Sequence, residues 1–322
     1  MSKEGQNKLY TAITEQIVDI LENHKHSGWQ KTWFSPSEPF AINPSSNHRY
    51  NAINQLLLSN VFMISEFSLN RWVTMKQANK LGAQIKKGSK SLPIYFRSHL
   101  VIDKRNNQNK NITSYYSKLS TDDKKELIKN ENIYFKYYLK YYRVFNVADV
   151  EGLPDYFYAP SKNQVSNPVD VNEKAEQIIN NIDVTIMQKE IDSCFYNPID
   201  DNIVVPFNQY FKSNADRYTS ILHEISHSTG HNTRLNRNKD RFKDRKKNYA
   251  FEELVAELSA AYLCAWCGIE KKITNNAAYI DSWLKALQDD KTFIMKASAE
   301  AEKSANFILE KANVVDSEPV ES

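Results

Sequence analysis

The segment ILHEISH, residues 221–227, decides the fold of this chain. It has the pattern H-E-x-x-H, and residues four apart on a helix project from the same face. His223 and His227 can therefore bind one Zn²⁺ through their imidazole nitrogens. Glu224 lies one position along, where it suits the role of general base toward a water molecule at the metal. The alternative is a polar surface helix, which the apolar neighbours of the motif disfavour because they predict partial burial.

A catalytic zinc site needs a third protein ligand and an open coordination position. Glu253 and Glu257, in the segment 249–257, are four apart and share a helix face, whereas Glu252 is expected to point away from it. The spacing alone leaves both acids open. The pattern resembles the second helix of gluzincins, in which the first acid binds zinc and the acid four later holds a ligand histidine. That resemblance implies Glu253 as the ligand and Glu257 as the orienting residue.

Two more side chains near the motif are candidates for the site. His231 follows His227 by four positions, but Gly230 is expected to end the helix. We therefore expect His231 at the helix end or on the substrate side, outside the ligand set. Tyr249 is a candidate donor of a hydrogen bond to an oxyanion.

Length and charge bound the class of protein. A chain of 322 residues predicts two domains, and 42 Lys and Arg against 39 Asp and Glu give a net charge of only +3. No stretch reaches the roughly 18 apolar residues of a membrane span, and the first residues lack the apolar core of a secretion signal. Three cysteines are typical of a reducing compartment. We therefore expect a cytoplasmic protein with no membrane partner.

The patterns predict an α+β protein in which residues 1–150 form one domain, 151–168 a Gly- and Pro-rich linker, 169–312 a second domain and 313–322 a disordered tail. In the first domain, periodicity predicts helices at 9–23, from about residue 50 and at 75–81, a strand at 92–100, and one strand or a pair at 133–147. Residues 103–131 are polar and are expected to form an inserted loop with at most a short helix.

The second domain is expected to be mostly helical, with a hairpin before the metal helix. Strands are predicted at 194–196 and 203–205, and helices at 169–182, 215–229, 249–267, 275–288 and 291–311. Either strand could be the edge that binds an extended peptide.

A basic segment is hidden within the nearly neutral total. Residues 71–110 contain ten Lys or Arg and one acid, Asp103. Basic side chains attract phosphates, and aromatic side chains stack on bases. The candidates for DNA contact on these grounds are Trp29, Trp33, Tyr50, Trp72, Lys86, Lys87 and Lys90. The alternatives are core packing for the aromatics and a solvated surface for the lysines.

The motifs closely resemble the antirestriction protein ArdC family, whose members join an N-terminal single-stranded-DNA-binding domain to a C-terminal zincin-like metallopeptidase domain. The resemblance rests on HEISHSTGH at 223–231, RLNR at 234–237, YAFEELVAEL at 249–258, NNAAYIDSWL at 275–284, WQKTW at 29–33, YNAIN at 50–54, WVTMKQA at 72–78 and VFNV at 144–147. The resemblance adds Asn51, in the motif YNAIN at 50–54, to the candidate DNA contacts. Ser228 stands where the family usually has an aromatic residue, and the insert at 103–131 departs as well.

The resemblance implies an antirestriction protein of a mobile element, which binds single-stranded DNA and one Zn²⁺ per chain and protects incoming DNA from host restriction. Mn²⁺ or another divalent ion also fits the donor set. A host restriction protein or another protein substrate is then a further expected partner. Two alternatives stay open: a DNA-binding module whose zinc is structural or silent, and a cytoplasmic zinc peptidase with no nucleic-acid role. Glu224 favours chemistry over a structural site, and the basic segment disfavours the plain peptidase.

Overall fold

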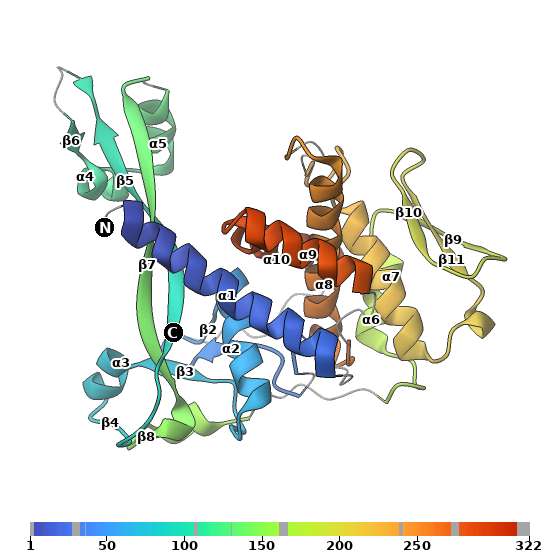
Figure 1. Cartoon of the computed structure of the whole chain (residues 1–322), viewed down its shortest axis with the longest axis horizontal. Helices are drawn as coiled ribbons and strands as arrows, with labels where there is room; N and C mark the ends of the chain where they lie inside the picture. The colour runs from blue at the N-terminus through green and yellow to red at the C-terminus, as the bar shows by residue number, and fades with distance from the viewer. Residues whose placement is uncertain are drawn as a thin grey trace.

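The structure is a computed structural model, which describes residues 3–27, 33–35, 37–105, 109–129, 131–160, 167–237, 241–271 and 277–313. Its helices and strands alternate irregularly along the chain, and the predicted α+β class is confirmed (Figure 1). The helices are α1 (Lys3–Ser27), α2 (Ala52–Ile64), α3 (Met75–Lys80), α4 (Thr113–Lys118), α5 (Thr121–Ile128), α6 (Glu173–Asn181), α7 (Asn214–Ser228), α8 (Arg245–Trp266), α9 (Ala277–Asp289) and α10 (Phe293–Lys311).

The strands are short except for one pair. They are β1 (Ile42–Asn43), β2 (His48–Arg49), β3 (Trp72–Thr74), β4 (Gln84–Ile85), β5 (Leu92–Asp103), β6 (Lys110–Asn111), β7 (Ile133–Asn146), β8 (Val150–Glu151), β9 (Thr185–Lys189), β10 (Phe195–Asn197) and β11 (Asn202–Pro206). Among the described residues, no helix combines the length and the apolar character that a membrane crossing needs.

A long hairpin of β5 and β7 dominates the N-terminal half. The two strands pair antiparallel from Leu92 opposite Val144 to Asp103 opposite Ile133. β3 joins the base of β7 and β6 the tip of β5, so the sheet has the order β3-β7-β5-β6. The second half of the hairpin is thus one continuous strand. Of the two forms expected for residues 133–147, a single strand or a pair, the structure has the single strand. The hairpin projects from the rest of the molecule (Figure 1).

The insert at the hairpin tip contains more regular structure than the sequence predicted. It forms β6, α4 and α5, so the expectation of at most one short helix is wrong. Ser120 caps α5 by accepting a hydrogen bond from the amide of Asp123. The polar residues of the insert therefore serve as caps and as exposed helix faces, which composition alone does not distinguish from a loop.

The C-terminal half places a small sheet beside a helical layer. β10 and β11 form the expected hairpin, and β9 pairs parallel with β11 in the order β10-β11-β9. β9 has mostly exposed side chains and carried no strand signal. α6 begins at Glu173, later than predicted, because the Asn172 side chain accepts from the amide of Ala175 and caps the helix there. α7 to α10 lie where the periodicity placed them.

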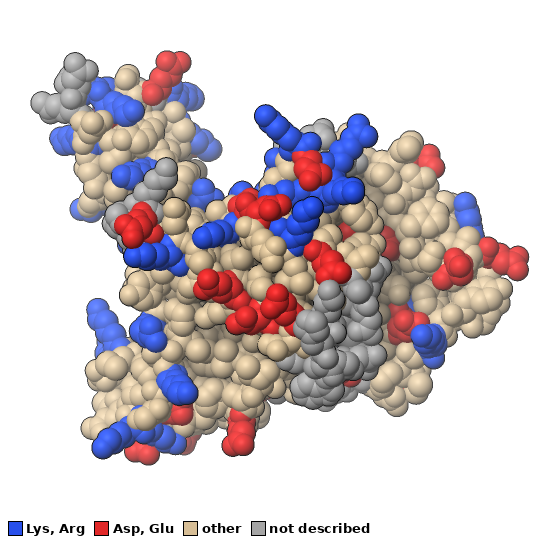
Figure 2. Space-filling model, in the orientation of Figure 1, with Lys and Arg blue, Asp and Glu red and all other residues tan. Residues whose placement is uncertain are grey.

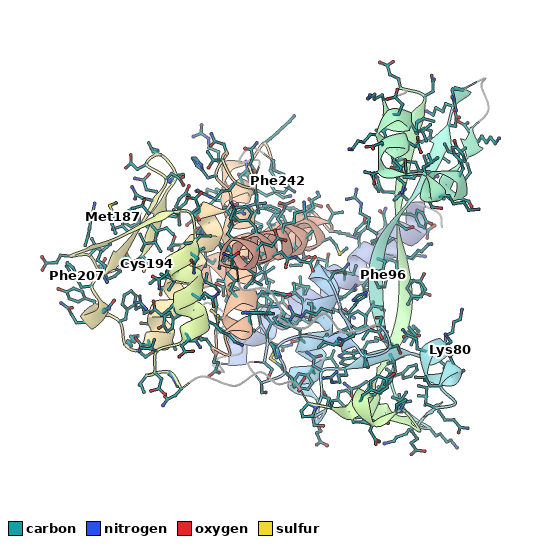
Figure 3. All side chains as sticks on the ribbon, turned by 180° about the vertical axis from the view of Figure 1, so that it is seen from behind. Lys80, Phe96, Met187, Cys194, Phe207 and Phe242 are labelled. Atoms are coloured by element: carbon teal, nitrogen blue, oxygen red, sulfur yellow. The ribbon has the colours of Figure 1, made fainter. Side chains whose placement is uncertain are left out.

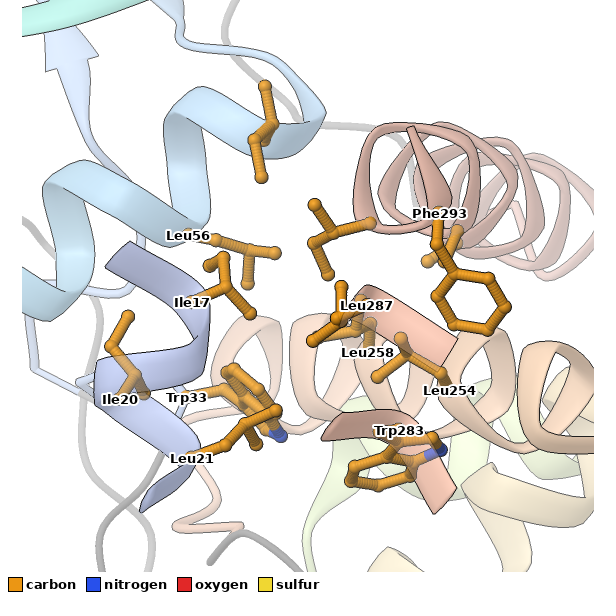
Figure 4. Close-up of a cluster of buried hydrophobic side chains, with 14 of the residues drawn as sticks. Ile17, Ile20, Leu21, Trp33, Leu56, Leu254, Leu258, Trp283, Leu287 and Phe293 are labelled. Carbon is orange, nitrogen blue, oxygen red and sulfur yellow. The ribbon is translucent and has the colours of Figure 1, made fainter. Parts of the chain in front are cut away.

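One hydrophobic core joins the two halves. Side chains of α1, of α2 and of the segment that follows α1 pack against α8, α9 and α10 (Figure 4). The labelled members include Ile17, Trp33 and Leu56 from the first half, and Leu258 and Trp283 from the second. The two halves therefore share buried apolar surface that neither could cover alone. The domain limits drawn from the sequence stay predictions.

Polar contacts also connect the halves. The Ala52 amide donates to Glu302 Oε1 on α10 at 3.1 Å, at the start of α2. The guanidinium of Arg49 lies 4.3 Å from the ring centre of Phe40 and 4.7 Å from that of Trp266 on α8. These contacts fix the orientation of the sheet domain relative to the helices that carry the site.

Candidate metal centre

α7 presents the two motif histidines toward α8. The Ser213 side chain accepts from the amide of Asp216 and sets the start of the helix. Ile221 and Ile225 are buried on the side of α7 that faces the β9–β11 sheet. The histidines are turned to another side, where His223 Nε2 and His227 Nε2 lie 3.1 Å apart.

Glu253 on α8 completes a group of three donors. Its Oε2 lies 3.6 Å from His223 Nε2 and its Oε1 lies 3.6 Å from His227 Nε2. Ligand atoms of all three residues lie within 4.8 Å of one another. Metal–ligand bonds to zinc are about 2 Å long, so tetrahedral ligands lie a little over about 3 Å apart. Two imidazoles and a carboxylate at this spacing fit one divalent ion.

Each histidine turns its other ring nitrogen toward a second acid. His223 Nδ1 lies 3.7 Å from Glu257 Oε2, and His227 Nδ1 lies 3.3 Å from Glu252 Oε1. Glu257 therefore has the place of an orienting residue. The expectation that Glu252 points away is wrong, because α7 and α8 cross so that positions 252 and 253 both reach His227.

A buried arginine supports Glu252, and sequence reasoning missed it. Arg237 donates to both carboxylate oxygens of Glu252, and it also donates to Thr229 Oγ1 and to the Ser226 carbonyl. A Cβ at Gly230 would lie 2.9 Å from Arg237 Nη2, so glycine leaves the room that the guanidinium fills. The only signal in the sequence was an arginine a few residues after the motif. Nothing local linked it to position 252.

Glu257 has a cation of its own. Lys271 Nζ lies 3.0 Å from Glu257 Oε2, and both side chains are largely buried. Each orienting glutamate thus joins one histidine to one cation: His223 through Glu257 to Lys271, and His227 through Glu252 to Arg237. Such outer partners hold the imidazole ring in place and raise its basicity.

The acids dominate the electrostatics of the site. Burial disfavours a charged His227, but hydrogen bonds to Glu252 and Glu253 raise its pKa to about 10. Burial likewise opposes ionisation of Glu252, yet His227 and Arg237 lower its pKa to about 2. The pKa of Glu253 is also held below its ordinary value by the two histidines, against the effect of burial. In the absence of a metal, a proton on His227 therefore balances part of the negative charge of these acids. A bound cation would balance that charge instead.

Glu224 lies between the metal donors and the edge of the sheet. Its Oε2 accepts a hydrogen bond of 2.9 Å from the amide of Tyr196 on β10. β10 is an edge strand of its sheet among the described residues, and this amide donates to Glu224 rather than to β11. Two clefts, of about 530 and 480 Å³, adjoin here and share His223, Glu224 and Glu253 as lining. The donors thus face open space along an available strand edge.

The two further candidates lie beside this site. His231 lines the second cleft after the end of α7, with its Nδ1 2.8 Å from Thr233 Oγ1 and 3.6 Å from Asp201 Oδ2. Tyr249 lines the same cleft, and its hydroxyl lies 2.9 Å from the hydroxyl of Tyr279. Burial and this hydrogen bond raise the pKa of Tyr249, so its hydroxyl keeps a proton to donate.

The aromatic candidates for DNA contact are mostly core residues. Trp33 and Trp72 are 3% and 1% exposed, and Tyr50 is 6% exposed with its hydroxyl bonded to the Trp72 carbonyl. Stacking of bases on these three rings is therefore ruled out, because α1, α2 and the sheet cover them. Asn51 is exposed at the start of α2, whereas Trp29 lies outside the described residues.

Lys86, Lys87 and Lys90 are exposed in the loop between β4 and β5. Lys86 Nζ donates to the Ala148 carbonyl at 2.8 Å. This loop lies near the base of the hairpin, away from α7 and α8 (Figure 1). The structure therefore does not bring the lysines together with the metal donors.

The fold and the site define a zincin-like metallopeptidase domain joined to a sheet domain. Residues 173–300 match the family described as zincin-like metallopeptidase. Residues 7–145 match the N-terminal domain of anti-restriction factor ArdC. The chain belongs to the antirestriction ArdC family.

Solved structures agree with this membership. The metal-free crystal structure of antirestriction ArdC from plasmid R388 is 29% identical, with a TM-score of 0.76, and the match covers 96% of this chain and 99% of that one. The Mn(II)-bound structure of the same protein gives a TM-score of 0.71 at 29% identity, with coverages of 94% and 98%. A protein with this architecture therefore binds a divalent metal.

Two proteins of Escherichia coli named DNA primase TraC are 32% and 33% identical over 95% of this chain. The chain spans only 20% and 27% of the length of these relatives. It therefore corresponds to one part of much longer proteins.

Proposed function

We propose that this protein binds single-stranded DNA and carries a Zn²⁺-dependent peptide-hydrolysing centre, and that it protects incoming DNA of a mobile element from host restriction. The single observation that carries the enzymatic part is the convergence of His223, His227 and Glu253 beside Glu224 in an open cleft. A structural zinc site has four protein ligands and needs no base, whereas three ligands with an adjacent acid are typical of catalytic sites.

The residues of the chain divide the work of hydrolysis. A divalent ion held by the three donors supplies Lewis-acid polarisation of water and of a scissile carbonyl. Glu224 accepts the proton that the attacking water loses, and later delivers a proton to the leaving amine. The hydroxyl of Tyr249 remains protonated and can donate to the oxygen that becomes negative during attack.

The edge strand β10 accounts for substrate alignment in this proposal. An extended peptide adds to a free strand edge through main-chain hydrogen bonds. The Tyr196 amide donates to Glu224 at 2.9 Å, which places this strand edge beside the proposed general base. A peptide placed there would run through both clefts and would bring a backbone carbonyl next to the metal donors. The substrate is therefore a protein segment in extended conformation.

The choice of Zn²⁺ follows from the donors. Two neutral imidazoles and one carboxylate in a compact group are a common ligand set of catalytic zinc, while oxygen-rich sites suit Mn²⁺. Zinc per chain, measured after purification without chelator, is expected to be about one. The double variant His223→Ala/His227→Ala is expected to contain none, and stoichiometric metal in that variant would contradict the donor set.

The experiment that tests the enzymatic role is the substitution Glu224→Gln. Glutamine keeps the size of the side chain and a carbonyl oxygen that can accept from the Tyr196 amide, so fold, metal content and DNA binding should persist. Peptide hydrolysis should fall by about 10²–10⁴-fold, the usual contribution of a positioned general base.

Protection of incoming DNA against a restriction endonuclease is compared between wild type and Glu224→Gln in cells. Loss of protection with metal and DNA binding intact supports hydrolysis as the mechanism. Full protection by the variant would defeat the enzymatic part. The protein would then act by occupying DNA or by contacting the restriction machinery.

A further inference from the structure

The strand β7 has an unusual composition for an exposed ribbon. Its sequence, IYFKYYLKYYRVFN, contains five tyrosines and three basic residues and no acid. Alternate residues of a strand lie on one face. The even positions form what is here termed the Tyr/Lys face, which consists of Tyr134, Lys136, Tyr138, Lys140 and Tyr142.

Helices cover part of the opposite face of the hairpin, on which Tyr137 and Tyr141 remain exposed. Leu139 on β7 and Tyr95 on β5 are buried in the core that α1 and α8–α10 share. Nearer the tip, Tyr116 of α4 packs edge-on against Phe135 and His99. These contacts all use odd-numbered residues of β5 and β7. On the even-numbered face, α2 packs against Ile94 and Val144 at the base of the hairpin. The members of the Tyr/Lys face lie beyond them toward the tip and are exposed, except Tyr138, which is half-buried.

Neighbouring side chains contact the rings of the Tyr/Lys face and restrict their motion. The ring of Phe96 on β5 meets Tyr142 edge-on with 5.6 Å between centres. Lys104 Nζ lies 4.2 Å from the ring centre of Tyr134. Tyr134 and Tyr142 nevertheless remain 36% and 49% exposed, so each presents free ring surface. Exposed rings whose positions are fixed lose little freedom when a flat ligand stacks on them.

We propose that the Tyr/Lys face is the track on which the protein binds single-stranded DNA, with bases stacked on the tyrosines and phosphates beside the lysines. Positive charge and interleaved aromatic rings together are the surface chemistry that binds single strands without sequence preference. The inference rests on the DNA-binding part of the proposed function and assigns it to a surface. Lys and Arg side chains also gather over the projecting hairpin tip (Figure 2).

The spacing of the rings selects a single strand over a duplex. Successive members of the face are about 7 Å apart, twice the strand rise of about 3.4 Å, so successive tyrosines, with a lysine between them, are about 14 Å apart. Bases within a duplex rise by about 3.4 Å and are stacked on each other, so their faces are not free. An extended strand with unstacked bases can reach successive tyrosines. A duplex can offer only its phosphates to the lysines.

The track lies far from the metal centre. Figure 3 labels Phe96 on the hairpin and Cys194 at the metal cleft, and the two residues lie on opposite sides of the molecule. Bound DNA on the hairpin would therefore leave the peptide cleft open. The two activities of the proposed function can then operate at the same time on one chain.

The test uses the whole protein and a fluorescent oligothymidine. The variant Tyr134→Ala/Tyr138→Ala/Tyr142→Ala should bind it at least about 100-fold more weakly, because each base–aromatic stack typically contributes 5-fold or more. The matched control is Tyr137→Ala/Tyr141→Ala, which removes two tyrosines of the same strand that are 54% and 50% exposed on the other face. The control should bind within about threefold of wild type.

Three more measurements sharpen the result. The triple phenylalanine variant keeps the rings and should keep affinity, and retained metal content reports that each variant is folded. Lys136→Ala/Lys140→Ala should lower the slope of log affinity against log salt by about 0.7 per lost phosphate contact.

Three outcomes overturn the proposal. Wild-type affinity in the triple alanine variant, or equal loss in the control, excludes the Tyr/Lys face while DNA binding itself stands. If the wild-type protein fails to bind the oligonucleotide, both this proposal and the DNA-binding part of the proposed function are wrong.

Discussion

At the level of single residues, acidic side chains hold the two histidines of the candidate metal centre, and buried cations hold those acids in turn. Glu252 and Glu257 each contact one ligand histidine and one buried cation. Removing a member of such a chain leaves a buried charge without its partner, which is costly. The positions of the three candidate donors therefore depend on residues outside that group.

We expect a graded loss of metal affinity along these chains. Glu253→Ala should lose the metal or bind it far more weakly, because it removes a ligand. Glu252→Gln and Glu257→Gln should each weaken binding by about 10–100-fold, as changes to outer partners of metal ligands do. Competition with a chelator of known affinity measures the three values. If Glu257→Gln abolished binding while Glu253→Ala spared it, the two acids would exchange roles.

The metal-free protein should lose stability as the pH rises. The pKa of His227 is raised from 6.5 to about 10 in the folded state, so the protonated form stabilises the fold fully below about pH 6.5. This contribution disappears as the pH rises through about 10. Denaturant unfolding of chelator-treated protein at pH 6.5, 8 and 10 checks the trend. His227→Gln should flatten it, and an unchanged slope in that variant would assign the effect to other groups.

At the level of elements, the site depends on where β10 lies against α7. The strand is only three residues long, and its Tyr196 amide reaches Glu224 rather than a neighbouring strand. In the proposed function, the helix supplies the chemistry and the strand edge aligns the substrate. Both clefts are lined by residues of the sheet and of the helices.

We expect Tyr196→Pro to damage hydrolysis more than Tyr196→Ala. Both remove the side chain, but only proline removes the amide that faces the substrate edge. Proline is tolerated on edge strands because that amide takes no part in the ladder. Metal content should stay at the wild-type level in both variants, with peptide hydrolysis measured in parallel. Equal activity of the two would mean that no main-chain contact forms at this position.

At the level of the whole molecule, the shared core couples the N-terminal half to the half that carries the candidate metal centre. α1 and α2 pack on α8, α9 and α10, so separation would expose the side chains drawn in Figure 4. The chain should therefore unfold in one cooperative step rather than as two independent domains.

The substitution Leu56→Ala tests this coupling. Leu56 is 3% exposed in the shared core, and its truncation should cost about 2–5 kcal/mol of the free energy of unfolding. Release of metal and loss of tertiary circular dichroism should shift together along the denaturant axis. Ile128→Ala is the control, since Ile128 is 48% exposed on α5 and should change stability little. Two separate transitions, with only one shifted, would refute the coupling.

Much of the fold followed from local patterns. The positions of α7 to α10 were predictable because apolar residues recur at helical spacing and caps mark the ends. Early strands and the insert were less predictable, since short strands are defined by partners distant in the chain. β9, for example, exists because Thr185–Lys189 pairs with β11. No feature within those five residues requires it.

The sequence by itself determined that His223, Glu224 and His227 share one helix with the spacing of a metal motif, because helix geometry is local. Only the tertiary structure decided that Glu252 reaches His227 and that Arg237 supports it, since the crossing of two helices sets those contacts. The same holds for the aromatic residues. The sequence determines which aromatic residues of a strand share a face. Whether a ring is a core residue or part of an exposed surface depends on which face the helices cover.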